Sequence, residues 1–177
     1  MPAVYSCDLP IDALLHRYAG SGAYADCYVA EIAGTVSHAE FVEAFYTTAV
    51  FKLERLILRL LVSRPSTDEE ARQLAQGNFD SFAAWSVEGR ATDQLLLSDF
   101  MGRTKSWLMV AAAHSAGVSG TQLFFGSAVV PVRSAATGRT GLGFAFRALL
   151  GFHKLYSRLL LKSAVSRLSR RSESRAG

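Results

Sequence analysis

The order of segments in the second half of the chain constrains its fold more than any other feature. Apolar runs separated by turn residues predict four strands, at Phe82–Arg90, Gln94–Phe100, Thr104–Ala112 and Thr121–Val132. Their separations are too short for parallel crossovers, so neighbouring strands must be antiparallel. A long, basic, amphipathic helix follows, to about Leu168. A curved antiparallel sheet closed by such a helix forms a container, and containers of this kind usually hold small apolar molecules.

The N-terminal half predicts one more strand and two helices. Residues 24–32 alternate loosely and are bounded by glycines, which indicates a strand. Ser37 followed by Glu40 matches a capping box, and the apolar stripe that begins at Phe41 predicts a helix over residues 38–61. A shorter helix is predicted over residues 69–76. The fold class is therefore α+β, with a curved antiparallel sheet wrapped around the C-terminal helix.

One domain is the most economical organisation for 177 residues. Residues 1–22 form an N-terminal arm or one helical turn packed on the body, and residues 23–168 form the domain itself. Residues 169–177 are rich in Ser and Arg, and we expect a frayed or disordered basic tail there.

Several classes of protein are excluded or disfavoured. The two cysteines, Cys7 and Cys27, make neither a disulfide framework nor a metal-ligand cluster, so no metal is predicted. The glycines of residues 138–143 lack a Walker lysine and a dinucleotide-binding pattern, and no cofactor is predicted. The N-terminus lacks the pattern of a signal peptide, and charged residues interrupt the apolar stretch at 142–161. A cytoplasmic protein without a transmembrane segment is therefore expected.

Charge is distributed unevenly along the chain. From Val132 to the end there are ten Lys or Arg residues and one acid, Glu173. The basic residues of the last helix and the tail could contact acidic lipid or nucleic acid. Alternatively, they could form a solvated helix face with a charged tail. The absence of interleaved exposed aromatic residues disfavours nucleic acid.

Both faces of the predicted sheet are apolar at its centre. In the third strand Trp107, Met109 and Ala111 lie on one face, while Leu108 and Val110 lie on the other. One face can pack on helices and a cavity. The other face needs a second partner, and the simplest partner is a second copy of the chain, which predicts a possible homodimer through the outer sheet face.

The sequence also resembles a bacterial family of unknown function placed near the START/Bet v 1 (SRPBCC) superfamily. The resemblance rests on the order of elements over about residues 24–168 and on dispersed residues in segments 51–55, 64–68, 82–90, 102–108 and 151–153. It implies a helix-grip fold, in which a sheet grips a C-terminal helix. That superfamily usually has six strands after the helices, whereas four are predicted here. The resemblance carries over no catalytic residues.

Aromatic and apolar side chains on the strands and the last helix are candidate pocket walls. Trp85 and Trp107 lie on alternate strands and would give large contact areas with few rotamers to freeze, although core packing would explain them as well. Phe125, Phe146 and Leu149 are further candidates for contacts with a ligand.

Two polar pairs are candidates for chemistry. Glu88 and Arg90, with Asp99 nearby, could bind the polar head of a ligand, or could form an ion pair on a solvated face. His153 and Tyr156, one helical turn apart, could grip a carbonyl oxygen or act as an acid/base pair. A half-buried histidine bonded to a backbone carbonyl is the structural alternative.

The leading hypothesis for function is reversible binding of a small hydrophobic molecule, such as a lipid, a polyketide or an aromatic metabolite. An enzyme of the cyclase, dehydratase or isomerase type would use the same cavity, with His153 and Tyr156 as its candidate catalytic residues. A structural homodimer without a ligand is the third possibility.

Overall fold

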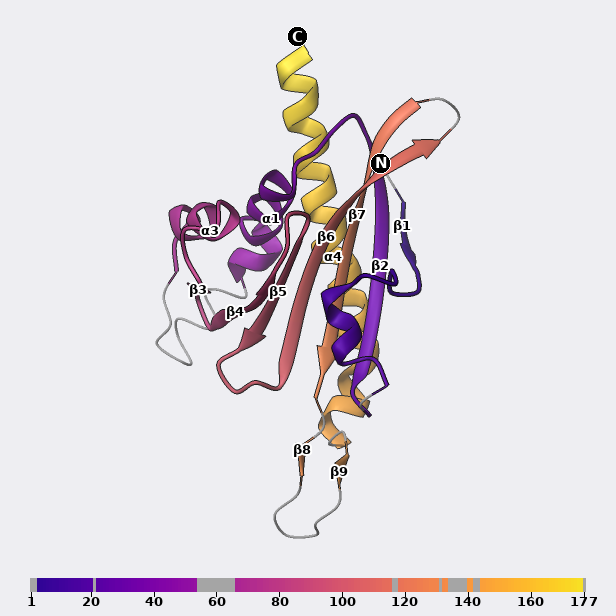
Figure 1. Ribbon diagram of the computed structural model, residues 1–177, viewed down its shortest axis with the longest axis vertical. Coiled ribbons are helices and arrows are strands. Elements are labelled where there is room, and N and C mark those ends of the chain that lie inside the picture. Colours follow the sequence, from indigo (N-terminus) through magenta and orange to yellow (C-terminus); the bar gives the residue numbers. More distant parts are fainter. Residues whose placement is uncertain are drawn as a thin grey trace.

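The computed structural model describes residues 3–20, 22–53, 66–115, 118–130, 132–133, 140–141 and 144–176. In this part of the chain seven strands form one antiparallel sheet in the order β1-β2-β7-β6-β5-β4-β3, and two short strands pair separately. Figure 1 shows the long helix α4 running along the sheet. The strands are β1 (Val4–Ser6), β2 (Tyr24–Ala33), β3 (Ser81–Phe82), β4 (Trp85–Arg90), β5 (Gln94–Asp99), β6 (Thr104–Ser115), β7 (Val118–Val129), β8 (Val132–Arg133) and β9 (Thr140–Gly141).

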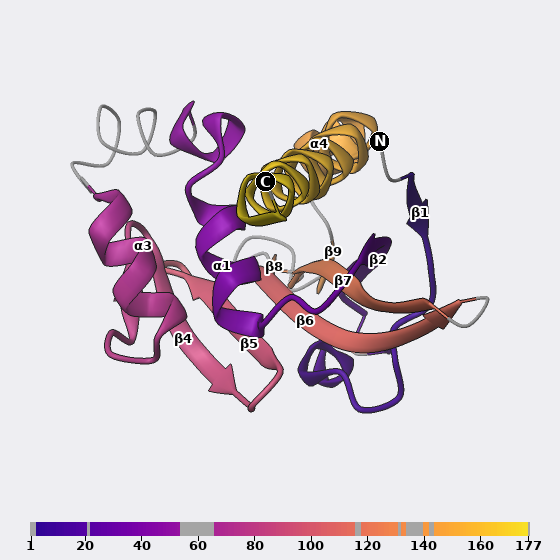
Figure 2. The same cartoon turned by 90° about the horizontal axis from the view of Figure 1, so that it is seen from above.

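The α-helices lie together on one face of the sheet. Figure 2 shows α1 (His38–Tyr46), α3 (Asp68–Ala75) and α4 (Phe144–Ala176) on this inner face, with the 3-10 helix η1 (Leu14–Arg17) on the opposite, outer face. The capping box predicted at Ser37 and Glu40 is present at the start of α1. A second capping box, from Thr67 and Glu70, begins α3. Both boxes satisfy backbone N–H groups that a helix N-terminus leaves without partners.

The first helix is shorter than the predicted span of residues 38–61. It ends at Tyr46, and residues 49–53 begin another helical segment. The hydroxyl groups of Thr47 and Thr48 donate to the carbonyl oxygens of Glu43 and Phe45, at 2.6 and 3.0 Å. These local bonds compete with the regular backbone pattern and explain the break. The remainder of the predicted span, residues 54–61, lies outside the described residues.

Aromatic side chains dominate the core between the sheet and the helices. The ring centroid of Phe45 lies 4.8 Å from that of Phe125 on β7, and Tyr46 lies 4.8 Å from Phe51. Phe51 stacks in turn on Phe82 of β3. Rigid rings therefore fix α1 and the segment after it against the inner face.

A second core covers the outer face of the sheet. Leu15 of η1 and Trp107 of β6 are both fully buried there. Gln94 connects this layer to the sheet, because its Oε1 accepts from the backbone N–H of Leu14 and from Nε1 of Trp107, both at 2.9 Å. The apolar face that suggested a homodimer is thus covered by the N-terminal segment of the same chain.

The strands agree with the predicted ones in place and direction but differ in their ends. Ala83 has a φ of 54° and divides the predicted strand 82–90 into β3 and β4. Five strands of the sheet therefore follow α3, instead of the four predicted. β7 begins at Val118, three residues before the predicted strand start at Thr121, and ends at Val129, before the predicted end at Val132. Gly120 lies inside this strand, where an added Cβ would be 2.9 Å from the carbonyl oxygen of Ile32, so the glycine allows close approach of β2.

The last helix is longer than predicted. It continues to Ala176, so residues 169–176, for which a disordered tail was expected, are helical. Arg171 donates to the carboxylate of Glu43 at 2.9 Å, and Arg167 donates to the carbonyl oxygen of Thr47 at 3.2 Å. These contacts fix the C-terminal half of α4 to the end of α1. Among the described residues, no helix combines the length and the apolar character needed to cross a bilayer.

Candidate ligand-binding pocket

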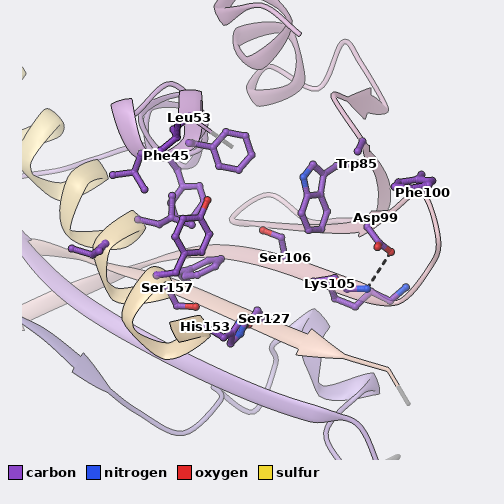
Figure 3. Close-up of a pocket in the computed structure, with 18 residues that line it drawn as sticks. Phe45, Leu53, Trp85, Asp99, Phe100, Lys105, Ser106, Ser127, His153 and Ser157 are labelled. Carbon is purple, nitrogen blue, oxygen red and sulfur yellow. Dashed lines mark hydrogen bonds between the residues drawn. The ribbon is translucent and has the colours of Figure 1, made fainter. Parts of the chain in front are cut away.

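A pocket of about 640 Å³ lies between α4, the helical segment at residues 49–53 and the inner face of strands β4 to β7. In Figure 3, Phe45 and Leu53 lie on one side of it, Trp85 and Phe100 on the other, and Ser127 and His153 at one end. Its volume falls within the range of pockets that bind drug-sized molecules. The apolar lining comes from Phe45, Val50, Phe51, Leu53, Ala84, Trp85, Phe100, Phe125, Leu159 and Leu160.

A polar cluster lies at the end of the pocket where α4 crosses β2 and β7. Asp26 and Ser127 are direct cross-strand partners, and both lie beneath His153 of α4. The hydroxyl of Ser127 donates to Oδ1 of Asp26 at 2.7 Å. The Oγ atom of Ser127 is 2.8 Å from Nε2 of His153, and Oδ2 of Asp26 is 3.5 Å from the same nitrogen. A carboxylate and a hydroxyl therefore hold one edge of the imidazole.

This cluster differs in geometry from a Ser-His-Asp catalytic triad. In a triad the serine and the aspartate bind opposite nitrogens of the histidine, and the histidine takes the serine proton. Here both groups lie at Nε2, and the serine proton is directed to Asp26. The geometry favours a positioned imidazole that exchanges a hydrogen bond or a proton with a ligand, and it does not favour an activated serine.

Tyr24 supports the carboxylate from the same strand. Its hydroxyl donates to Oδ2 of Asp26 at 3.2 Å, and its ring meets that of His153 edge to face. Burial and the charge of Asp26 raise the pKa of Tyr24. The phenol therefore remains a protonated donor at neutral pH.

A second polar position lies on the strands opposite. Ser106 and Tyr46 share a hydrogen bond of 3.1 Å between their hydroxyl groups. The indole Nε1 of Trp85 is buried and has no hydrogen-bond acceptor within the described part of the chain. Protein atoms cover this nitrogen, so Trp85 offers the pocket its ring and not its N–H group.

Asp99 lies at the mouth of the pocket, but its hydrogen bonds are local. Its Oδ1 atom accepts from the backbone N–H groups of Arg103 and Thr104, at 2.6 and 3.1 Å. These bonds fix the turn between β5 and β6, which carries Phe100 into the pocket wall.

Four residues predicted from the sequence to contact a ligand line this pocket: Trp85, Phe125, His153 and Tyr156. Trp107 does not, since it packs on the outer face against η1. The side chains of Phe146 and Leu149 lie outside the described part of the structure.

Glu88 and Arg90 are separated by an irregularity in β4 and do not form the predicted pair. The register shifts between Val87 and Gly89. Glu88 faces the outer side, where its carboxylate accepts from Nζ of Lys105 at 2.7 Å and from the hydroxyl of Tyr18. Arg90 instead donates to two backbone carbonyl oxygens, those of Leu74 and Phe79, at 3.0 and 3.1 Å. Neither side chain lines the pocket, and both hold neighbouring segments against the sheet.

Asp26 and Ser127 were missed because their strands are largely apolar. Asp26 alternates in phase with Tyr24 and Tyr28, and this is the only signal in the sequence that its carboxylate faces inward. Its pairing with Ser127 depends on the register of β2 with β7, which local sequence does not specify.

The two thiols lie on the outer face, away from the pocket. The sulfur atoms of Cys7 and Cys27 are 3.4 Å apart, and both residues are free cysteines. Burial raises the pKa of each thiol. The reactive thiolate form is therefore scarce at neutral pH.

The sequence matches no protein-family model and no curated protein. No group of three or more His, Cys, Asp and Glu side chains suited to a metal ion occurs among the described residues.

Proposed function

We propose that this protein reversibly binds one small, mainly apolar molecule in the pocket beneath α4. The pocket itself carries the proposal: about 640 Å³ lined largely by aromatic and aliphatic side chains, with few polar groups. Burying ~300 Å² of apolar ligand surface at ~25 cal/mol per Å² would contribute about 7 kcal/mol before entropy costs. Micromolar binding then needs few polar contacts.

The polar groups restrict the ligand class. His153 with Ser127 lies at one end of the pocket. A ligand with an oxygen atom on an apolar skeleton could form a hydrogen bond at that end. Aromatic ketones, polyketides and hydroxylated lipids have this composition, whereas pure hydrocarbons offer these polar groups no partner.

We also propose that the fold is of the helix-grip type and related to the START/Bet v 1 superfamily. The support is the position of α4 across the inner face of an antiparallel sheet, with a pocket between them. Five sheet strands follow α3, which is closer to the six strands usual in that superfamily than the four predicted from the sequence.

Native mass spectrometry of the purified protein, before and after incubation with a chloroform–methanol extract of bacterial cells, tests the binding proposal. The expected result is a one-to-one adduct that denaturing extraction releases as a small apolar molecule. Val50 lines the pocket, whereas Ile11 is 93 % exposed and lies between Leu9 and Ala13 of the outer-face cluster. Val50→Trp should therefore abolish the adduct, and Ile11→Trp should retain it. Absence of any adduct, or equal adducts in both variants, would contradict the proposal.

A second candidate function is catalysis in the same pocket, favoured by the Asp26–Ser127–His153 cluster. The imidazole would transfer a proton to or from a bound carbonyl compound, as in an isomerisation or dehydration. The test follows the mass and structure of the extracted ligand during incubation with the protein. Loss of turnover with unchanged affinity in His153→Ala would support catalysis, while an unchanged ligand with the wild-type protein would exclude it for that molecule.

A further inference from the structure

Exposed apolar side chains gather at the entrance of the pocket. Eight large hydrophobic residues are exposed among the described residues. Three of them line the pocket: Leu53, Phe100 and Leu159, with exposed fractions of 59, 52 and 43 %. Met101 follows Phe100 in the β5–β6 turn, and Leu155 lies one helical turn before Leu159 on α4. We call these five residues the apolar rim.

The apolar rim combines side chains from three separate parts of the chain. They come from the helical segment at residues 49–53, the β5–β6 turn and α4. Single exposed apolar residues are ordinary on a protein surface, but a cluster around a pocket entrance indicates a surface that contacts something apolar.

A row of basic residues lies beside the rim on α4. Lys154, Arg158 and Lys162 are exposed and spaced four residues apart, so they share one stripe next to Leu155 and Leu159. Arg103, also exposed, follows Met101 in the β5–β6 turn. An apolar surface bordered by cations matches the boundary of an anionic bilayer, where acyl chains lie beneath negative headgroups.

We propose that the apolar rim and the basic row dock this protein onto anionic lipid bilayers, with the pocket entrance facing the membrane. Charge complementarity favours a bilayer over a second copy of the chain. A symmetric dimer through this surface would place the basic row of one α4 close to the basic row of the other, which is repulsive. Docking goes beyond ligand binding and does not require the pocket to be occupied.

Vesicle co-sedimentation tests the proposal directly. The full-length protein is mixed with vesicles of phosphatidylcholine alone or of phosphatidylcholine with phosphatidylglycerol, at low and at high salt. Binding to the phosphatidylglycerol vesicles is expected, and it should weaken as salt screens the basic row. Leu155→Ser should weaken the affinity about tenfold, and Lys154→Gln with Lys162→Gln should weaken it about fivefold for each charge.

Matched controls come from the opposite side of the sheet. Ile11 lies between Leu9 and Ala13 of the outer-face cluster, and Arg17 belongs to η1. Ile11→Ser removes an exposed apolar residue and Arg17→Gln removes an exposed charge there, so both should bind vesicles like the wild type. Unchanged thermal unfolding would show that every variant is folded. Equal losses in the controls, equal binding to both vesicle types, or no binding would overturn the proposal. A wild-type dimer that Leu155→Ser dissociates, without vesicle binding, would assign the rim to self-association and also overturn it.

This experiment separates docking from ligand binding. The substituted residues lie outside the pocket lining, so uptake of a ligand from solution should persist in all of these variants. Loss of vesicle binding with retained ligand uptake would show that these substitutions affect the docking surface and leave the pocket intact.

Discussion

The Oγ atom of Ser127 lies 2.8 Å from Nε2 of His153, and this contact joins β7 to α4 at the end of the pocket. The same hydroxyl donates to Asp26, whose side chain is only 9 % exposed. One short side chain therefore connects two strands and the helix that covers them.

Substitution of Ser127 by alanine should destabilise the protein by about 1–2 kcal/mol, because a largely buried carboxylate loses a hydrogen-bond donor and the imidazole loses its contact with the hydroxyl. Urea unfolding measures the change. Ser119→Ala removes an exposed hydroxyl from the same strand and should change stability by less than about 0.5 kcal/mol. Similar losses in both variants would show that the contact contributes nothing specific.

Gly126 allows the outer layer to pack closely on β7. A Cβ atom there would lie 2.8 Å from Cδ2 of Leu15 and 2.9 Å from Cε3 of Trp107. We expect Gly126→Ala to cost about 1–3 kcal/mol by overpacking. The penalty should be smaller when Leu15→Ala is already present, because the truncated side chain leaves room. Additive losses in a double-mutant cycle measured by denaturation would refute this account.

The sequence predicts the sheet well, because strand positions depend on local features. Turn residues after Arg90 and Phe100 separate apolar runs, and the capping box at Ser37 places the start of α1. The sequence does not predict which face each tryptophan occupies, since both sheet faces are apolar in the middle. Trp107 lies on the outer face only because residues 7–18 cover it, a contact between segments about ninety positions apart.

The site is less predictable than the fold, because it also depends on contacts between segments far apart in the sequence. His153 and Tyr156 could be placed on the inner face from helical periodicity. The partner residues of His153 required the long-range register of β2 with β7. The shift of register in β4 separates Glu88 from Arg90, which were expected to lie on the same side of the strand. The local sequence pattern does not predict this shift.

His38 should make stability depend on pH. Burial lowers the pKa of His38, whose Nε2 atom is buried without a hydrogen-bond partner among the described residues. The unfolded chain then binds a proton at a higher pH than the folded protein does, so the free energy of unfolding should fall as pH drops below about 6.5. His38→Gln should flatten this decline in urea unfolding series, whereas His16→Gln, at an exposed position, should leave it unchanged. An unaltered decline in His38→Gln would assign it to other groups.

The most direct test of ligand binding is a fluorescence titration with N-phenyl-1-naphthylamine, an uncharged apolar probe. We predict saturable binding at one site per chain. Val50→Trp, which fills the pocket, should abolish it, and Ile11→Trp, which adds the same side chain at an exposed position, should preserve it. A linear, unsaturable response from the wild-type protein, or the same titration curve from Val50→Trp as from wild type, would contradict the claim that this pocket holds a small apolar molecule.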